Sequence, residues 1–249
     1  VAVACQDLLN RFVAAQPIVP PQIFWRRMAG SLNRLGRGYG YIAIAAIDVA
    51  MWDLYSKRLD MPLYEALGGT ARTLPVYGSG GFSPMQDADS AVERSLEYVE
   101  MGCKAVKLRV AGQAADWNRI RAVADALPDG VDILADANEK CDLARAQWLV
   151  NALADVNALW LEEPLPAHDT NGFMKLASTS PIPIATGEHH QGVVEIAPLL
   201  RSGAVSIVQP DLAMMGGITE CLRVASLAEH YNVVVSPHFL PACQKNPNP

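Results

Sequence analysis

The sequence has no excess of basic residues and few charged residues of either sign. Lysine and arginine number 20 against 26 aspartate and glutamate residues, which gives a net charge of −6. This balance argues against binding to nucleic acid or to anionic lipid headgroups. Charged residues make up 18% of the 249 residues and hydrophobic residues 51%, so intrinsic disorder is excluded and a sizeable core is expected.

Long hydrophobic runs and paired cysteines are also missing. The longest apolar stretch, residues 42–49, contains Asp48 and is far shorter than the roughly 20 residues that a membrane span needs. The five cysteines are scattered without a CxxC pair, which is typical of reduced thiols rather than of a disulfide framework. The N-terminus lacks the basic start of a signal peptide. We therefore expect a cytoplasmic globular protein.

Helical patterns fill residues 1–72, and a different organisation begins at residue 73. Residues 40–57 form the clearest predicted helix, with Asp48, Asp53 and Lys57 spaced to keep one face in water. From residue 73 onward, short apolar strands alternate with amphipathic helices, a pattern that predicts a parallel sheet covered by helices. The strands are expected at residues 74–77, 105–110, 132–135, 158–161, 184–186, 206–209 and 233–236. The helices are expected at residues 88–101, 115–127, 143–153, 172–177, 193–201 and 217–230.

The regular spacing of these units favours a TIM-type (β/α) barrel over a doubly wound sheet. Seven strands are visible, and the eighth is missing because the residues after His238, FLPACQKNPNP, cannot supply a strand and a helix. We therefore predict an incomplete, truncated barrel over residues 73–249, preceded by a helical domain over residues 1–72. The sequence contains no GxGxxG or Walker pattern, and we interpret the glycine-rich run 78–81 as a turn.

Acidic residues follow three consecutive predicted strands, at the end where barrel enzymes hold their active sites. Asp136, Glu162 and Glu188 are successively 26 residues apart, one barrel unit per step. Three converging carboxylates repel one another unless a cation lies among them, and oxygen-only ligands suit Mg²⁺ or Mn²⁺. Each acid taken alone is more often a helix cap or a surface ion pair. The matching positions on three strands favour a metal site.

A histidine and an aspartate end the last two predicted strands. Asp211 and His238 are 27 residues apart, so an Asp211 oxygen can accept a hydrogen bond from one imidazole nitrogen. This contact orients the ring and leaves the other nitrogen to exchange a proton. A lone histidine is more often structural, but the aspartate one unit earlier favours an acid/base pair.

These motifs together resemble the enolase superfamily, within its mandelate racemase-like group. The resemblance covers nearly the whole chain and rests on an ordered series: Lys-x-Arg at 107–109, Asp-x-Asn at 136–138, Glu-Glu-Pro at 162–164, Gly-Glu at 187–188, Pro-Asp at 210–211 and Ser-x-His at 236–238. Residues 45–69 also resemble the end of that family's α+β capping domain, so residues 1–72 would be its helical remnant. The resemblance implies Mg²⁺ at the three acids, abstraction of a proton α to a carboxylate with enolate stabilisation, and a His–Asp dyad as acid/base.

One motif departs from the family pattern. Family members commonly carry Lys-x-Lys where this chain has Lys107-Leu108-Arg109, and a guanidinium hardly releases its proton. We interpret Arg109 as a group that holds the substrate carboxylate, with Lys107 beside it; alternatively, both cations pair with the acids of the site. Asn138, on the same strand face as the acid two positions before it, and His189 are further substrate-binding candidates. Glu163 is expected to support the site.

The chemistry predicted for this site is that of a metal-dependent carbon–oxygen lyase, an acid-sugar dehydratase. One acid/base residue, His238, is sufficient for syn elimination of water. The alternatives are a racemase or epimerase of a 2-hydroxy acid that uses Lys107 as a second base, a catalytically incomplete fragment, and a Schiff-base aldolase acting through Lys107. The expected partners are a small-molecule carboxylate and further copies of the chain in a homo-oligomer, without nucleic acid or membrane.

Overall fold

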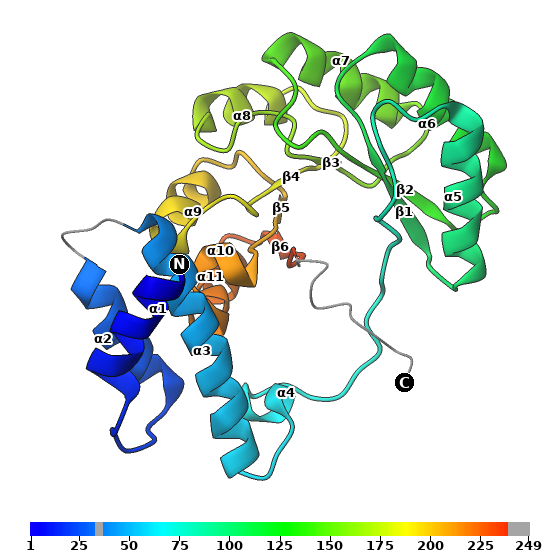
Figure 1. The fold of residues 1–249 in the computed structure, drawn as a ribbon. Helices are drawn as coiled ribbons and strands as arrows, with labels where there is room; N and C mark the ends of the chain where they lie inside the picture. Colours follow the sequence, from blue (N-terminus) through cyan, green and yellow to red (C-terminus); the bar gives the residue numbers. More distant parts are fainter. Residues whose placement is uncertain (33–36, 239–249) are drawn as a thin grey trace. The chain divides into compact units, whose positions relative to one another are not determined.

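The computed structural model describes residues 1–32 and 37–238 of the chain (Figure 1). It divides into two compact units by the density of internal contacts. Unit 1 comprises Val1–Arg72, Gly187–Leu200 and Val208–Pro249, and unit 2 comprises Thr73–Thr186 and Arg201–Ile207.

The N-terminal part of unit 1 is helical, as predicted for residues 1–72. Its elements are α1 (Ala2–Leu8), η1 (Leu9–Val13), α2 (Pro21–Ser31), α3 (Gly38–Arg58) and α4 (Leu63–Ala66). Phe24 and Met28 of α2 pack with Ile44 of α3 in a buried apolar cluster. This cluster explains why these amphipathic segments fold together, since burial of such side chains is the main favourable term in folding.

The exposed face predicted for α3 holds only in part. Asp53 and Lys57 are exposed and form an ion pair at 2.7 Å between Oδ2 and Nζ. Asp48 is buried, with 1% of its surface exposed. The prediction that Asp48 faces water was therefore wrong, because that side of α3 packs against another helix of unit 1, α11 (Ile218–His230).

The remaining elements of unit 1 come from the second half of the chain. They are most of α9 (Gly192–Arg201), α10 (Leu212–Met215), α11 and β6 (Val234–Val235). Val208, the last residue of β5 (Ile207–Val208), also belongs to unit 1. Its carbonyl accepts a hydrogen bond of 3.0 Å from the amide of Ser236.

Unit 2 contains a parallel sheet whose strands follow one another in chain order. The strands are β1 (Ala105–Arg109), β2 (Asp132–Asp136), β3 (Leu161–Glu162) and β4 (Ile184–Thr186). The connecting helices are α5 (Ala88–Glu100), α6 (Ala114–Ala126), α7 (Leu143–Ala154) and α8 (Thr170–Ala177). Val106, Leu134 and Leu161 are fully buried, which is typical of parallel strands covered by helices. The carboxyl ends of these strands therefore lie at the same edge of the sheet (Figure 1).

The first predicted strand, residues 74–77, was wrong. Leu74 and Val76 are apolar but 62% and 64% exposed, so their side chains do not pack against the sheet. Only Gly78 pairs with the sheet, in a single parallel bridge to Val106, where its amide donates to the carbonyl of Ala105 at 2.9 Å. The other predicted strands form but are mostly shorter, and the predicted helices form with ends shifted by a residue or two.

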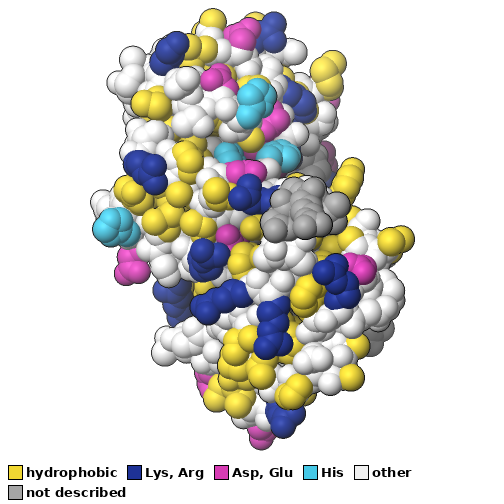
Figure 2. Space-filling model, turned by 90° about the vertical axis from the view of Figure 1, so that its left-hand side faces the viewer, with side chains coloured by type: hydrophobic (Ala, Val, Ile, Leu, Met, Phe, Trp, Pro, Cys, Tyr) yellow, Lys and Arg dark blue, Asp and Glu magenta, His cyan; other side chains and the backbone are white. Residues whose placement is uncertain are grey.

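The surface mixes charged and apolar groups. Figure 2 shows hydrophobic side chains interspersed with lysine, arginine, aspartate and glutamate on one face of the molecule. Within residues 1–32 and 37–238, no helix combines the length and the hydropathy that a transmembrane span requires. The cysteines of the described segments, Cys5, Cys103, Cys141 and Cys221, are free thiols, as predicted; Cys243 lies outside the described residues.

Candidate active site

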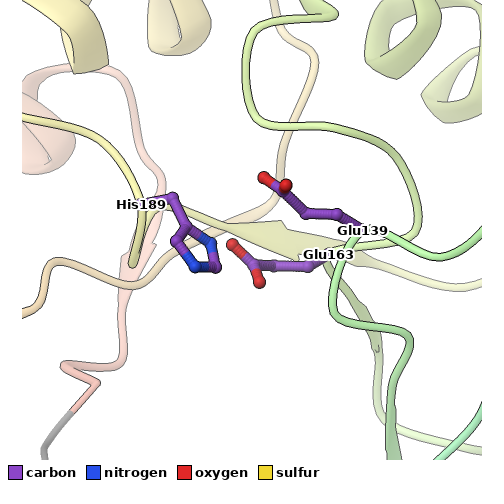
Figure 3. A group of neighbouring side chains, drawn as sticks. All are labelled: Glu139, Glu163 and His189. Atoms are coloured by element: carbon purple, nitrogen blue, oxygen red, sulfur yellow. The ribbon is translucent and has the colours of Figure 1, made fainter.

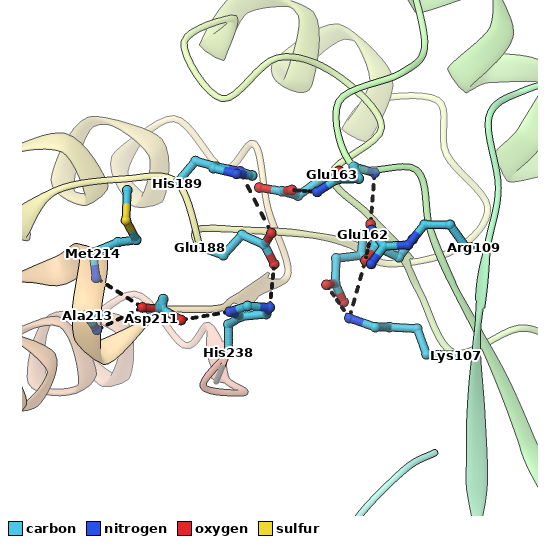
Figure 4. Close-up of polar contacts among 12 residues, drawn as sticks. Lys107, Arg109, Glu162, Glu163, Glu188, His189, Asp211, Ala213, Met214 and His238 are labelled. Atoms are coloured by element: carbon cyan, nitrogen blue, oxygen red, sulfur yellow. Dashed lines mark hydrogen bonds and ion pairs between the residues drawn. The ribbon is translucent and has the colours of Figure 1, made fainter. Parts of the chain in front are cut away.

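The carboxyl ends of β1, β2 and β3 bring two cations and two carboxylates together in unit 2 (Figure 4). Asp136 lies in register with Arg109 on one neighbouring strand and with Glu162 on the other. The ammonium of Lys107 forms a salt bridge with Glu162 and lies 3.5 Å from Asp136 Oδ2. Arg109 Nη1 lies 2.8 Å from the same oxygen. Lys107, Asp136 and Glu162 are buried, whereas the side chain of Arg109 is 32% exposed.

The charge balance of this cluster keeps Lys107 cationic. Burial by itself would lower the pKa of Lys107, but the carboxylates of Glu162 and Asp136 outweigh it and raise the pKa above its usual range. The ring of Tyr77, whose centroid lies 5.5 Å from Nζ, adds a cation–π contact. The ion pairs predicted as the alternative role of these two cations are therefore present.

Two aromatic residues of this cluster were missed by the sequence analysis. Trp160 donates from Nε1 to Glu162 Oε2 at 3.3 Å, and its ring meets Tyr77 edge-on with centroids 5.8 Å apart. Trp160 lies two residues before Glu162, so the alternation of a strand could have placed both side chains on one face. Tyr77 gave no such signal, because the strand predicted around it does not form.

The backbone turns left-handed just beyond β2 and β3. Asn138, Glu139 and Glu163 have φ values of 43°, 62° and 42°. The strand alternation therefore stops at Asp136, and the prediction that Asn138 lies on its strand face was wrong. The amide of Asn138 donates to Asp136 Oδ1 at 2.8 Å, and its Nδ2 donates to Glu163 Oε2 at 3.3 Å. Glu163 is fully buried, and Glu139 accepts a hydrogen bond from the amide of Ala167 at 2.7 Å. Both acids lie in the loops beyond the strands (Figure 3).

Unit 1 holds the other predicted site residues. Gly187 has a φ of 144°, and a Cβ at this position would lie 2.8 Å from the backbone nitrogen of Gln209, so only glycine fits. The next residue, Glu188, is buried and lies 3.1 Å through Oε2 from Nε2 of His238. His189 is 43% exposed, with Nδ1 3.9 Å from Glu188 Oε1.

His238 pairs with Asp211, as predicted. The two residues form a parallel bridge, and Nδ1 of His238 lies 2.8 Å from Asp211 Oδ2 (Figure 4). Asp211 also caps α10, because its Oδ1 accepts from the amides of Ala213 at 2.8 Å and Met214 at 3.0 Å. Burial tends to raise the pKa of Asp211, but the hydrogen bonds from His238 and from these amides lower it overall. The aspartate is thus held as an anion that fixes the imidazole through Nδ1, while Nε2 lies beside the carboxylate of Glu188.

The donor groups fit a hard divalent cation on their chemistry. Asp136, Glu162 and Glu188 supply only carboxylate oxygens; the first two end β2 and β3, and Glu188 comes two residues after β4. All three are buried, and a buried carboxylate requires positive charge nearby. No nitrogen or sulfur ligand is present in this set, which favours Mg²⁺ over softer metals.

Two protein families match this chain over most of its length. Residues 90–246 match the family described as enolase C-terminal domain-like, and residues 8–68 match the mandelate racemase/muconate lactonizing enzyme N-terminal domain. The chain belongs to the mandelate racemase-like group of the enolase superfamily. Membership in this superfamily confirms the predicted α/β, TIM-barrel fold class.

Two relatives with named activities are about a third identical to the chain over the aligned residues. The D-galactonate dehydratase of Variovorax paradoxus is 36% identical over 222 residues, and the L-talarate/galactarate dehydratase of Salmonella typhimurium is 34% identical over 205 residues. These alignments cover 86% and 81% of this chain but 58% and 51% of the relatives. The chain therefore spans little more than half of their length.

A solved structure supports the same family membership. The L-talarate dehydratase of Polaromonas sp. JS666, crystallised with Mg and L-glucarate, superposes with a TM-score of 0.88 at 32% identity. The match covers 97% of this chain and 70% of that chain.

Proposed function

We propose that the protein is a Mg²⁺-dependent lyase that dehydrates an acid sugar, beginning with removal of the proton α to its carboxylate. The observation that carries this proposal is the environment of His238, which contacts Asp211 through Nδ1 at 2.8 Å and Glu188 through Nε2 at 3.1 Å. An imidazole fixed on one side by an aspartate, with its other nitrogen beside a carboxylate suited to a metal, is arranged to move a proton. The two relatives and the Polaromonas enzyme support the substrate class.

The predicted site residues have separate roles in binding the metal and the substrate. Asp136, Glu162 and Glu188 would hold the Mg²⁺, which when bound stabilises negative charge developing on the substrate carboxylate. Arg109, the most exposed cation of the cluster, holds that carboxylate, with Lys107 beside it and with Asn138 and His189 as further contacts.

His238 carries the proton in both halves of the elimination. Its Nε2 takes the proton from the α-carbon, and the same proton is then delivered to the β-hydroxyl as the carbon–oxygen bond breaks. Water leaves, and the enol product tautomerises to a 2-keto-3-deoxy acid. Asp211 keeps the ring in the orientation that exposes Nε2 and stabilises the imidazolium formed between the two steps.

The racemase alternative receives less support from this arrangement. A second base must be neutral to take a proton from the opposite face of the substrate. Lys107 is instead engaged as an ammonium by both Asp136 and Glu162. The same engagement argues against a Schiff-base aldolase, which needs an uncharged lysine amine.

Four finer points extend this proposal. Mn²⁺ can substitute for Mg²⁺ at this site, since both ions accept carboxylate oxygens in six-coordinate sites. The free cysteines support a cytoplasmic location. The family matches at 8–68 and 90–246 support a domain division at residue 72. The active form is a homo-oligomer of this chain, which light scattering of the purified protein tests directly.

Proton NMR in D₂O tests the proposed function. The protein is incubated with D-galactonate, galactarate, L-talarate, D-gluconate and mandelate, first with Mg²⁺ and then with EDTA. We expect a Mg²⁺-dependent loss of the α-proton signal together with new methylene signals of a 3-deoxy product. Loss of the α-proton signal without water loss would favour the racemase, and no exchange with any compound would contradict the proposal.

Matched variants separate metal binding from proton transfer. Glu162→Gln should abolish both Mg²⁺ binding, measured by calorimetry, and proton exchange. His238→Asn should abolish exchange while Mg²⁺ binding remains. The controls are Glu97→Gln and His230→Asn, which change the same residue types on helices away from the strand ends and should leave both measurements unchanged.

A further inference from the structure

The path from Asp211 to the rest of unit 1 runs through two glycines. Asp211 begins α10, a helix of only four residues, and α10 is followed by Gly216 and Gly217 with φ values of 104° and 99°. Both values lie in the left-handed region that favours glycine, so this Gly-Gly link has little intrinsic stiffness. Any displacement of the link is carried through α10 to Asp211 and, through its Oδ2, to His238.

The link receives its support from helices near the start of the chain. Trp25 of α2 donates from Nε1 to the carbonyl of Gly216 at 2.7 Å. Asp48 of α3 accepts two hydrogen bonds from Thr219, at 2.8 Å from the amide to Oδ2 and at 2.7 Å from Oγ1 to Oδ1. Trp52, also on α3, donates from Nε1 to the same Thr219 Oγ1 at 3.0 Å.

Close packing at the link leaves no room for a side chain of its own. A Cβ on Gly217 would lie 2.6 Å from Asp48 Oδ2, and a Cβ on Gly216 would lie 2.8 Å from the ring of Tyr41. Asp48 and Thr219 are 1% and 4% exposed, so their hydrogen bonds form away from water. The link is therefore held by direct contact with α3.

Asp48 takes the place of a local helix cap. The N-cap position of α11 is Gly217, which has no side chain to accept from the first amides of the helix. A serine or aspartate at the N-cap would cap α11 locally, without burying a carboxylate from another helix. A distant carboxylate that must be desolvated is a costly way to stabilise one helix, but it joins α3 to the start of α11.

The same turn of α11 also reaches toward the segment of Glu188. Glu220, which is 2% exposed, accepts from the amide of Val193 at 2.8 Å, in the first turn of α9. The segment between β4 and α9 contains Glu188. The first turn of α11 therefore contacts the segment that carries Glu188, and it follows the Gly216-Gly217 link that leads to Asp211, the partner of His238.

We propose that Asp48 is a positioning residue for the His238–Asp211 pair, acting through Thr219 and the Gly216-Gly217 link. The proposal rests on the acid/base role of His238 given above and adds a requirement for the N-terminal helix α3 in the proton-transfer step. The hydrogen bonds of Asp48 connect it to Thr219. Its removal should misplace the imidazole while leaving the cluster of Lys107 and Arg109 intact.

The test combines kinetics with NMR of the histidine. Asp48→Asn keeps the shape of the side chain but removes its charge, and the matched control is Asp53→Asn on the exposed face of the same helix. For Asp48→Asn we expect kcat to fall about tenfold with KM within about twofold, since substrate binding is unchanged and orientation is lost. The control should match the wild type in both constants.

The second readout does not depend on turnover. The ring-proton signals of His238, assigned by comparison with His238→Asn, are followed as a function of pH. We expect the titration midpoint and the chemical shift of His238 to change in Asp48→Asn and to stay unchanged in Asp53→Asn. If the wild type has no dehydratase activity, the proposed function fails, but this measurement still decides the positioning role.

Thr219→Ala serves as a milder second variant in case Asp48→Asn does not fold. It retains the amide that donates to Asp48 Oδ2 and removes the Oγ1 that contacts Asp48 Oδ1 and Trp52. A smaller change in the same direction is expected for both kcat and the His238 titration. A folded variant with unchanged kcat and an unchanged His238 titration would overturn the proposal.

Discussion

The buried carboxylate of Asp48 should make the stability of the protein depend on pH in a defined way. Burial, only partly offset by the hydrogen bonds from Thr219, raises the pKa of Asp48 from 3.8 to about 6. Because the folded-state pKa lies above the unfolded value, the folded protein binds a proton first as pH falls. The contribution of Asp48 to stability therefore increases as pH decreases through 6, and it is complete only below the unfolded value.

The size of the effect follows from the two pKa values. Linkage between pH 8 and pH 5 gives a gain of about 1.4 kcal/mol in the free energy of unfolding from this residue alone. The measurement is urea denaturation of the wild type, Asp48→Asn and Asp53→Asn across this pH range. The wild type should gain about 1.4 kcal/mol relative to Asp48→Asn, whereas Asp53→Asn should follow the wild type. Parallel profiles for the wild type and Asp48→Asn would refute the reasoning.

Three further predictions concern other positions. Gly187→Ala should destabilise the protein by about 2 kcal/mol or more, seen as a lower Tm, because its Cβ meets the backbone of Gln209. Lys107→Met should cost about 3–5 kcal/mol by leaving buried carboxylates uncompensated, and added Mg²⁺ should restore part of the lost Tm. Burial, and to a smaller extent the charge of nearby acids, raises the pKa of Cys221 to about 12. Mass spectrometry should therefore find Cys221 unalkylated by iodoacetamide at pH 8 until guanidinium unfolds the chain.

The positions of the site residues along the chain were predictable because parallel strands place their carboxyl ends at one edge. Asp136 and Glu162 end neighbouring strands in register, as their equal spacing predicted. The pairing of Asp211 with His238 followed from the same logic, and the hydrogen bond of 2.8 Å confirms it. The metal-binding and catalytic roles of these residues stay predictions.

The wrong predictions share one physical cause, namely contacts that local sequence patterns do not encode. Residues 74–77 are apolar enough for a strand, but Leu74 and Val76 stay exposed because no neighbouring element covers them. Asn138 departs from strand alternation because the chain turns left-handed after Asp136. Asp48 falls on the polar side of its helix by periodicity, yet α11 covers it. Each outcome depends on a segment distant in sequence.

The hydrogen bonds between Asp48 and Thr219 also affect the order in which the protein can fold during its synthesis. The two residues are 171 positions apart, so at about 5–20 residues per second the ribosome needs roughly 10 to 30 seconds to supply the partner. Throughout that interval α3 is complete, but the side that later packs on α11 is uncovered. A newly made chain therefore exposes this helix face to chaperones or to other unfinished chains, and the start of α11 acquires its cap only once Thr219 has been made.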